Sequence, residues 1–519
     1  MSVFRIIQTV DELIQATQDI RARYLILRNN LSDVPTIKLK PFQSLTGEFK
    51  GCTIRFADDT PGICLNKANE LRNLQLIATD NQPVIFQAEG VDKIGTHQLS
   101  HLTLNGYASF IYGASFEKGK IEASFIHFPQ ADTTALSDRP MRYDCYNQVG
   151  AFTLWNKSEL ESTLKVKINQ LSFGSAQEPI NASGLMLWGN AERKGAVKAE
   201  IISLGATYMH TQIPCNAPDL VAAALCNGYQ AKIEQALITG EILTQECNEM
   251  GIYNWGEIDT LTMTAPLTTR GANACGIIQA GVADHLNFTQ EVKTHGTGAR
   301  AFFMYDGHIK HLYFNNVTTH GDAATAIQFS RHIDHLTIDG DVNAYGDALN
   351  IKMHDGAIIK ASADAIGVKY GGSARLIRCS GNIISHGNDV RTIYNEASIE
   401  RLLVQGQVLA KGEQSVAMEV NQGYFGGENI HFVSEKWAAL RVESAKVNHC
   451  HNLSAKGKNF DLLIDILSSV DRNIFAKEFL SGIFQDDVEI EYLDNLHLSK
   501  EEAPELIAAK ANETDLKKN

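Results

Sequence analysis

Apolar and polar residues alternate through much of the chain, in short runs that end at glycine-rich corners. Residues 327–329 (IQF) and 336–338 (LTI) are two such runs. A period of two is typical of β-strands, and no stretch keeps a 3.6-residue period long enough for a repeated helix. The pattern therefore predicts an all-β protein made of many short strands.

The strand pattern itself repeats between residues 246 and 371. Glycines recur there every 25 residues, at Gly271, Gly296, Gly321, Gly346 and Gly371. A fixed period of about 20–50 residues marks a solenoid, a propeller or another array. At about 3.3 Å per residue, two or three short strands and their corners fill a coil of this length, whereas a propeller blade needs roughly 40–45 residues. The period therefore favours a parallel β-helix.

Two motifs recur within the coils, a Gly-Ile pair and a His-Leu or Asn-Leu strand opener. The first is found at Gly62-Ile63, Gly184-Leu185, Gly251-Ile252, Gly276-Ile277, Ala326-Ile327 and Asn350-Ile351, and the second at Arg72-Asn73-Leu74, Ser100-His101-Leu102, Asp284-His285-Leu286, Lys310-His311-Leu312, Asp334-His335-Leu336 and Glu428-Asn429-Ile430. Together with the segment 39–54, these motifs resemble the right-handed parallel β-helix of the pectate-lyase and polygalacturonase (pectin-lyase-like) superfamily. The resemblance covers roughly residues 36–490, and it implies a single right-handed solenoid and a carbohydrate-active protein.

The two ends of the chain depart from the repeat. Residues 9–12 (TVDE) form a capping box, which predicts a short helix within an N-terminal cap at 1–35. The β-helix then spans 36–455, with long excursions at about 106–160 and 205–222. Residues 456–498 are expected to form the last coils and an irregular C-terminal cap, and 499–519 a polar tail.

The superfamily's catalytic residues are missing from the Gly-Ile strand. In the polygalacturonase branch a carboxylate lies two residues before the Ile, and a glycosidase needs two carboxylates. Here that position holds Met250, Cys275, Ala301, Thr325 and Leu349. Asn248 and Asn273 match the leading Asn of the motif, and we interpret them as a structural ladder. The hydrolase mechanism therefore cannot be carried over to this strand.

A lyase would instead need carboxylates that bind calcium and a basic residue that removes a proton. Candidate groups lie in successive coils, namely Asp306, Asp322, Asp347 and Asp355 with Arg300, Arg331 and Lys352. Solvated corner charge is the alternative interpretation of these residues. Calcium is thus expected only if the protein is a lyase, and otherwise no cofactor is expected.

The outward face of the Gly-Ile strand is the predicted site. Alternation sends Ile252, Ile277, Phe303, Ile327 and Ile351 inward, and it sends Tyr253, Ile278, Met304, Gln328 and Lys352 outward. Two residues further on, Trp255, Ala280, Asp306, Ser330 and His354 also face outward. We predict that Tyr253, Trp255, Met304 and Lys352 bind a ligand and that Asp306 and His354 are catalytic. The alternative is that a long excursion or a second subunit covers these outward residues.

Histidines occupy two repeating columns. His285, His311 and His335 precede an apolar strand, and His295 and His320 precede the repeat glycine. The H-x-x-H pairs at 308/311 and 332/335 would suit zinc. Identical corners also stack identical rings, so we interpret the columns as ladders and predict no metal site.

Composition and charge limit the classes of binding partner and the cellular location that we expect. The chain has 44% hydrophobic residues, 20% charged residues and a net charge of −14, without a basic run, which disfavours nucleic acid. Asp11 and Glu12 interrupt any signal peptide, and no 18-residue apolar stretch is present, so we expect a soluble protein that is cytoplasmic or exported by a non-classical route. Nine cysteines without a C-x-x-C pair are interpreted as reduced thiols.

Two functions follow as hypotheses. The first is a polysaccharide lyase, glycoside hydrolase or binding protein that holds a polysaccharide or host-surface glycan along the solenoid face. The second is a non-enzymatic interaction protein, such as an adhesin, a phage receptor-binding spike or a secreted effector. The oligomeric state is left open between monomer and trimer.

Overall fold

A computed structural model shows that the chain is all-β. It describes residues 3–142, 144–190, 192, 194–217, 219–352, 357–421, 423–443, 446–451, 453–465 and 496–499. Within these residues strands account for 59% and there is one α-helix, as the alternating pattern predicts. The chain divides into two compact units, the N-terminal unit at Met1–Gln290 and the C-terminal unit at Glu291–Asn519. None of the described helices is both long and apolar enough to cross a membrane.

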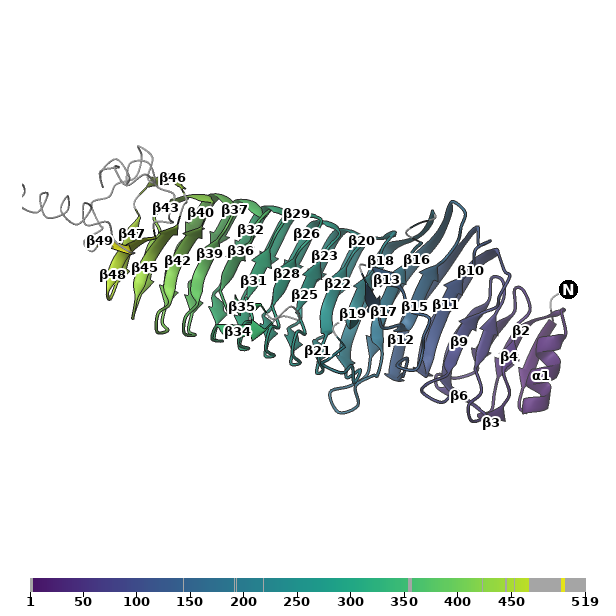
Figure 1. The fold of residues 1–519 in the computed structure, drawn as a ribbon. Helices are drawn as coiled ribbons and strands as arrows, with labels where there is room; N and C mark the ends of the chain where they lie inside the picture. The colour runs from purple at the N-terminus through teal and green to yellow at the C-terminus, as the bar shows by residue number, and fades with distance from the viewer. Residues whose placement is uncertain are drawn as a thin grey trace, which may run out of the picture. The chain divides into compact units, whose positions relative to one another are not determined.

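The N-terminal unit contains two stacked sheets of almost entirely parallel strands (Figure 1). Its first sheet consists of β1 (Val3–Ile7), β2 (Ala22–Leu27), β3 (Leu31–Val34), β5 (Ser44–Gly47), β6 (Cys52–Phe56), β8 (Glu70–Ile77), β10 (Lys93–Asn105), β12 (Lys118–Gln130), β16 (Ser162–Phe173), β18 (Gly195–Met209), β20 (Ala231–Ile238), β21 (Ile242–Thr244), β23 (Glu257–Met263), β24 (Leu267–Thr269) and β26 (Val282–Phe288). Its second sheet consists of β4 (Ile37–Lys38), β7 (Ile63–Leu65), β9 (Pro83–Gln87), β11 (Tyr107–Tyr112), β13 (Met141–Arg142), β14 (Cys145–Asn147), β15 (Gly150–Asn156), β17 (Ser183–Trp188), β19 (Leu220–Asn227), β22 (Glu249–Asn254) and β25 (Ile277–Gln279).

The C-terminal unit has the same two-sheet organisation. Its first sheet consists of β27 (Val292–Thr294), β29 (His308–Phe314), β30 (Val317–Thr319), β32 (His332–Ile338), β33 (Val342–Ala344), β37 (Ser373–Cys379), β38 (Ile383–Ser385), β40 (Ser398–Val404), β41 (Gln407–Ala410), β43 (Tyr424–Glu428), β44 (His431–Ser434), β46 (Lys446–His451) and β47 (Ser454–Gly457). Its second sheet consists of β28 (Phe302–Met304), β31 (Ile327–Phe329), β36 (Ile366–Val368), β39 (Arg391–Asn395), β42 (Val416–Asn421), β45 (Ala438–Glu443), β48 (Phe460–Asp465) and β49 (Leu496–Ser499). A separate hairpin pairs β34 (Leu349–Lys352) with β35 (Ile358–Ala361).

Strand register confirms the 25-residue spacing in both units. Ile252 pairs with Ile277 in the N-terminal unit, and Phe302 pairs with Ile327 in the C-terminal unit. The same spacing reaches the corners, where Asn248 and Asn273 both have positive φ, at 58° and 56°. Asn tolerates this left-handed conformation better than most residues. These asparagines therefore shape the corner, in agreement with their structural interpretation.

The repeat glycines lie where neighbouring coils pass closest. A Cβ on Gly346 would collide with the carbonyl of Gly321, and a Cβ on Gly387 would collide with that of Gly346. Only glycine fits such an approach. The column thus continues at Gly387, and the prediction that Gly371 belongs to it is wrong, because residues have been inserted between the two coils.

The inserted residues are the hairpin β34–β35. Ile327 pairs with Ile366, so Ile366 and not Ile351 is the next inward residue of the second sheet. Ile351 lies in the antiparallel hairpin opposite Ile359, and it is 39% exposed. The predicted inward orientation of Ile351 is therefore wrong, since a local hairpin interrupts the period.

The predicted helix forms as α1 (Val10–Gln18), beside the first strands of the N-terminal unit (Figure 1). The Thr9 hydroxyl accepts a hydrogen bond from the Glu12 amide, and the Glu12 carboxylate accepts one from the Thr9 amide. This reciprocal bonding satisfies amides that have no partner within the helix. Leu13, Ala16 and Thr17 are buried, so the apolar side of α1 packs against β1–β4.

The structure narrows both excursions. The strands β11, β12 and β15 take up about half of 106–160, and the long connection between β12 and β15 is described at 131–142 and 144–149. In 205–222, β18 continues to Met209 and β19 starts at Leu220, so residues 210–219 form the loop. Of the expected C-terminal cap and tail, residues 466–495 and 500–519 lie outside the described residues.

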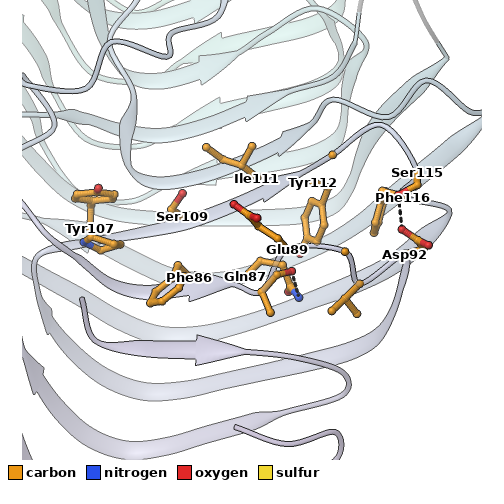
Figure 2. Close-up of a pocket in the computed structure, with 15 residues that line it drawn as sticks. Phe86, Gln87, Glu89, Asp92, Tyr107, Ser109, Ile111, Tyr112, Ser115 and Phe116 are labelled. Atoms are coloured by element: carbon orange, nitrogen blue, oxygen red, sulfur yellow. Dashed lines mark hydrogen bonds between the residues drawn. The ribbon is translucent and has the colours of Figure 1, made fainter. Parts of the chain in front are cut away.

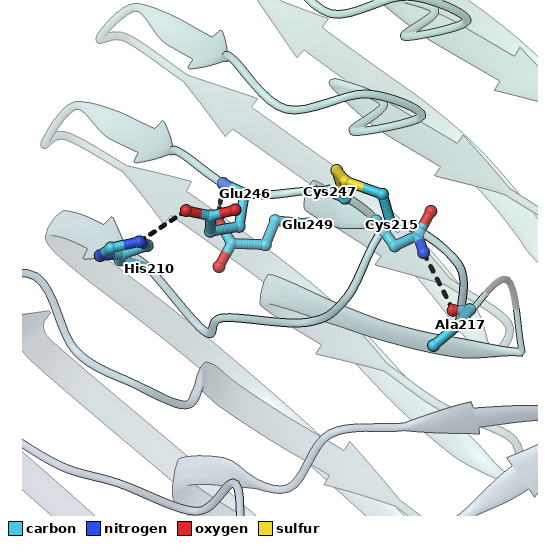
Figure 3. The surroundings of a disulfide bond; sticks show 7 residues. His210, Cys215, Ala217, Glu246, Cys247 and Glu249 are labelled. Atoms are coloured by element: carbon cyan, nitrogen blue, oxygen red, sulfur yellow. Dashed lines mark hydrogen bonds and ion pairs between the residues drawn. A yellow bond between two sulfur atoms is a disulfide. The ribbon is translucent and has the colours of Figure 1, made fainter.

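A disulfide ties the second excursion to the corner before β22. Cys215 and Cys247 are bonded with Cα atoms 5.2 Å apart, so the interpretation of all cysteines as reduced thiols is wrong for this pair (Figure 3). Beside it His210 Nε2 lies 2.6 Å from a Glu246 carboxylate oxygen. The buried Glu249 carboxylate accepts the amides of Gln245 and Glu246 at 2.7 and 2.9 Å. The sequence spacing gave no sign of this pairing because chain folding brings the two thiols together.

We expect the variant Cys215→Ala to lose ~2–4 kcal/mol of unfolding free energy, because the disulfide restricts a 32-residue loop in the unfolded chain. Urea unfolding without reductant measures the loss. Dithiothreitol should destabilise the wild-type protein by a similar amount and leave the variant unchanged. A wild-type protein insensitive to reductant would contradict the bond.

Candidate functional site

Two of the predicted ligand-binding residues are covered in the N-terminal unit. Tyr253 and Trp255 are only 3% and 6% exposed, and their rings meet edge to face with centroids 5.7 Å apart. Tyr253 continues an outward column through Met186 and Cys226, which are also buried. An outward side chain on a bare sheet would be solvent-accessible, so another segment must cover this face.

That segment is the excursion at 131–149. Its strand β14 pairs with β19 at Tyr146 and Leu220. Cys145 Sγ lies 4.0 Å from the Tyr253 hydroxyl, and Asn147 Oδ1 lies 3.9 Å from Cys226 Sγ. The outward direction of Tyr253 is correct, but its availability to a ligand is not. The alternative that an excursion covers these residues accounts for their burial.

A hollow of about 550 Å³ lies elsewhere in the N-terminal unit, over β9 and β11. Figure 2 shows Phe86 and Tyr107 toward one end, Asp92 and Ser115 toward the other, and Glu89 between them. The Asp92 carboxylate accepts a hydrogen bond of 2.6 Å from the Ser115 hydroxyl. Ring faces beside carboxylates suit the apolar faces and hydroxyls of a sugar. Phe86, an aromatic residue that points outward on β9, is a sequence signal for this hollow. The alternation pattern alone did not single it out.

In the C-terminal unit, Met304 points into the core. Phe302 and Met304 are fully buried, whereas Phe303 is half-buried and pairs with outward Gln328. The predicted orientations of Phe303 and Met304 are therefore both wrong. Counting 25 residues from Ile277 reaches Phe302, and a one-residue slip in a strand exchanges its two faces.

Of the two predicted catalytic residues, only Asp306 belongs to the part of the chain that the structure describes. Asp306 is partly exposed in the corner after β28, where its carboxylate lies 3.4 Å from Arg331 Nε. His354 lies outside the described residues. Lys352 ends β34 opposite Ile358, and its side chain is also outside the description. The roles predicted for Asp306, His354 and Lys352 stay predictions.

The acidic residues proposed for calcium hold the coil corners. The Asp322 carboxylate accepts the Asp347 amide at 2.9 Å, and the Asp347 carboxylate accepts the Asn388 amide at 2.6 Å. Each side chain therefore bonds the backbone of the next coil, 25 residues further on for Asp322 and 41 for Asp347. Asp355 lies outside the described residues.

The histidine columns stack as predicted. In the C-terminal unit the rings of His311 and His335 are 5.0 Å apart, and those of His295 and His320 are 4.8 Å apart. Ring planes differ by 13° and 9°, respectively. The repeated corner thus places identical rings face to face.

A charged cluster lies on the outward side of the second sheet of the C-terminal unit, around the end of β36. We call it the Lys369 cluster, and its members are Asp364, Lys369, Arg391, Tyr394 and Glu396. Register places Gly367 between Gln328 and Tyr394 on this face. Because Gly367 has no side chain, the neighbouring long side chains lie over its strand.

Asp364 and Arg391 form the anchor of the cluster. Asp364 is fully buried, and its carboxylate receives Arg391 Nε and Nη2 at 3.1 and 3.0 Å. The Arg391 amide and the Ser362 hydroxyl also donate to it. Burial alone would raise the pKa of Asp364, but the charges of Arg391 and Lys369 hold that pKa below its ordinary value.

Lys369 and Arg391 both lie against Tyr394. The Lys369 ammonium is 4.1 Å and the Arg391 guanidinium carbon 3.9 Å from the centre of the ring, as in cation–π contacts. The Tyr394 hydroxyl donates a hydrogen bond of 2.5 Å to Glu396. Burial raises the pKa of Tyr394, and the contact with Glu396 raises it further.

The pKa of Lys369 is lowered. Removal from water is the largest cause, and the positive charges of Arg391 and Arg300 add to it, while Asp364 and Glu396 act in the opposite direction. A lysine in such surroundings releases its proton at a lower pH than a solvated lysine does. The cluster therefore offers an amine that can act as a general base.

The repeat pattern of the sequence did not predict the Lys369 cluster. Its members come from two successive coils and lie at both ends of two strands, so they are not adjacent in the sequence. In addition, the hairpin β34–β35 shifts β36 away from the 25-residue period. A signal was nevertheless present, because residues 364–369 (DAIGVK) repeat the Gly-Ile motif's apolar pattern with charges at both ends.

A scan against protein-family models gives no match for this chain, and comparisons with curated proteins and with solved structures give none either. The functional interpretation therefore depends on the geometry of the described residues.

Proposed function

We propose that the protein binds an acidic polysaccharide on the second sheet of the C-terminal unit and cleaves it by β-elimination, with Lys369 as the base. The proposal includes the finer fold, a single right-handed parallel β-helix with α1 as the N-terminal cap. The observation that carries the proposed reaction is the partly buried Lys369 amine, which lies over the Tyr394 ring beside the Arg391 guanidinium. Resemblance of the repeat to pectin-lyase-like chains supports the substrate class.

The reaction uses the lowered pKa directly. Neutral Lys369 removes the proton at C5 of a uronate residue, and the electrons of that C–H bond form a C4–C5 double bond. The bond from C4 to the leaving glycosidic oxygen breaks, and that oxygen takes a proton from water. Arg300 lies 4.7 Å over the Phe303 ring and donates a hydrogen bond to Gln328, and in this proposal its charge binds the uronate carboxylate.

We expect Lys369→Ala to reduce the rate of cleavage by about 10²–10⁴-fold, the range typical of a general base. The assay is unsaturated-uronate absorbance with purified protein on a panel of uronate-containing polysaccharides. In the wild-type protein, kcat/KM should rise with pH through the lowered pKa of Lys369, because only the neutral amine accepts a proton.

Two variants control this test. Lys369→Arg keeps the charge but cannot lose its proton near neutral pH, so it should be as inactive as Lys369→Ala. Lys360→Ala removes a half-exposed lysine that pairs with Asp389, and it should retain activity. Full activity in Lys369→Arg would rule out the base and leave only a charge contact.

The rival function is a non-enzymatic interaction protein such as an adhesin, a phage receptor-binding spike or a secreted effector. Asp364 pairs with Arg391, and Tyr394 bonds Glu396. These contacts favour a non-enzymatic function, because such pairs also occur in rigid binding faces. Wild-type protein that binds a glycan without releasing unsaturated products would decide for this rival.

A further inference from the structure

The first sheet of the C-terminal unit carries a second cluster, on β29 and β32, whereas the Lys369 cluster lies on the second sheet. We propose that His308, His332 and Asp334 bind a divalent transition-metal ion such as zinc. This site is separate from the proposed polysaccharide face, and neither function depends on the other. Among the described residues, these three side chains are the group whose ligand atoms all lie within 4.8 Å of one another.

The geometry places two imidazoles around one carboxylate. His308 belongs to β29, while His332 and Asp334 belong to β32, the next strand of the sheet. His332 Nε2 lies 3.0 Å from Asp334 Oδ1, and His308 Nε2 lies 3.6 Å from Asp334 Oδ2. A tetrahedral zinc ion with bonds of ~2.0–2.2 Å separates its ligand atoms by about 3.3–3.5 Å. The two nitrogen–oxygen distances, each to a different oxygen of the Asp334 carboxylate, lie close to this spacing, and ligand atoms of the three residues lie within 4.8 Å of one another.

The two rings are stacked with centroids 5.6 Å apart and planes within 2°. The Nε2 atoms of both rings face the Asp334 carboxylate, as their distances to its oxygens show. The H-x-x-H pairs considered from the sequence, by contrast, separate their members by about 10 Å along a strand, since each residue advances ~3.3 Å. The metal ligands thus come from successive coils rather than from one H-x-x-H pair.

A neighbouring hydroxyl can accept the Nδ1 proton of His332. His332 Nδ1 lies 2.6 Å from the Ser373 hydroxyl, on the next strand β37. A histidine that donates its Nδ1 proton to such a partner keeps a lone pair on Nε2 for a metal. Ser373 therefore acts as a positioning residue for His332.

The donor set selects the class of metal. Two imidazole nitrogens and one carboxylate oxygen suit zinc and its first-row neighbours, whereas calcium prefers oxygen ligands alone. The three side chains are about 20–36% exposed, so water can fill the remaining coordination position. An ion bound here would join two successive coils of the sheet.

One basic residue competes with the metal. Arg375 Nη2 lies 3.3 Å from Asp334 Oδ1, where its positive charge opposes a cation. We therefore expect Arg375→Gln to bind the metal more tightly than the wild-type protein does. A site without metal affinity would show no such gain.

The test uses the purified full chain after chelation and dialysis. Isothermal titration with Zn²⁺ should give one site per chain, and Co²⁺ should give the visible absorption bands of a coordinated ion. We expect at least ~10-fold weaker Zn²⁺ binding in His332→Gln and in Asp334→Asn, the scale on which even outer-shell changes act.

His335→Gln is the matched control, since His335 lies on the same strand and stacks on His311 in the same way. It should leave Zn²⁺ affinity unchanged. The cobalt spectrum of the wild-type protein tests the site without any substitution. Absence of stoichiometric Zn²⁺ and Co²⁺ binding, or equal losses in His335→Gln and His332→Gln, would overturn the proposal.

Discussion

Ile327→Asp is expected to destabilise the C-terminal unit by at least ~4 kcal/mol. Ile327 is fully buried on β31, between Phe302 on one neighbouring strand and Ile366 on the other. A carboxylate at this position would be enclosed by apolar side chains without a partner, which is among the costliest single changes in a protein. Urea unfolding followed by circular dichroism measures the loss.

Ile384→Asp is the control for this experiment. Ile384 lies on β38 and points outward, whereas its neighbour Ile383 is fully buried. The same substitution should therefore cost within about 1 kcal/mol at position 384. Similar unfolding curves for Ile327→Asp and the wild-type protein would contradict the register of the second sheet.

Arg391→Met is expected to lower the free energy of unfolding by about 3–5 kcal/mol at neutral pH. The substitution keeps an unbranched, flexible side chain but removes the guanidinium, so the fully buried Asp364 carboxylate loses its bidentate partner. Removing one member of a buried ion pair is more damaging than the pair's net contribution suggests, because the other charge stays desolvated.

The pH dependence of this effect has a definite sign. In the wild-type protein the pKa of Asp364 is below its unfolded value, so its contribution to stability is present above about pH 4. That contribution is lost as pH falls through the folded pKa. In Arg391→Met burial dominates and raises the pKa of Asp364, so the difference between the two proteins should narrow on acidification.

Arg401→Met provides the comparison with an exposed pair. Arg401 Nη2 lies 3.2 Å from a Glu428 oxygen, and the two side chains are 55% and 42% exposed. Solvated ion pairs contribute roughly 0–1 kcal/mol. If Arg391→Met and Arg401→Met lost the same unfolding free energy, burial of Asp364 would not determine the size of the effect.

Periodic features could be predicted from the sequence because each coil places its residues in the same surroundings. Alternation gave the strands, the glycine spacing gave the coil length, and the stacking of His311 on His335 followed from their equal positions. The helix α1 was equally local, since Thr9 and Glu12 bond each other within one turn.

The candidate site could be predicted only in part. The outward direction of Tyr253 followed from alternation, but the excursion above it is joined by contacts such as Cys145 with Tyr253, which are 108 residues apart. Met304 was assigned to the wrong face because the period was miscounted by one residue, and a strand has only two faces.

The amino-acid sequence by itself determined the all-β class, the 25-residue spacing and the residues that shape each corner, because these depend on backbone conformation and on contacts between identical positions. Only the tertiary structure decided which faces are covered, that Cys215 meets Cys247, and that Asp364, Lys369 and Arg391 converge. Those outcomes depend on the lengths and paths of insertions, such as the β34–β35 hairpin and the 131–149 segment. Insertions lie outside the repeat, so its period carries no information about where they pack.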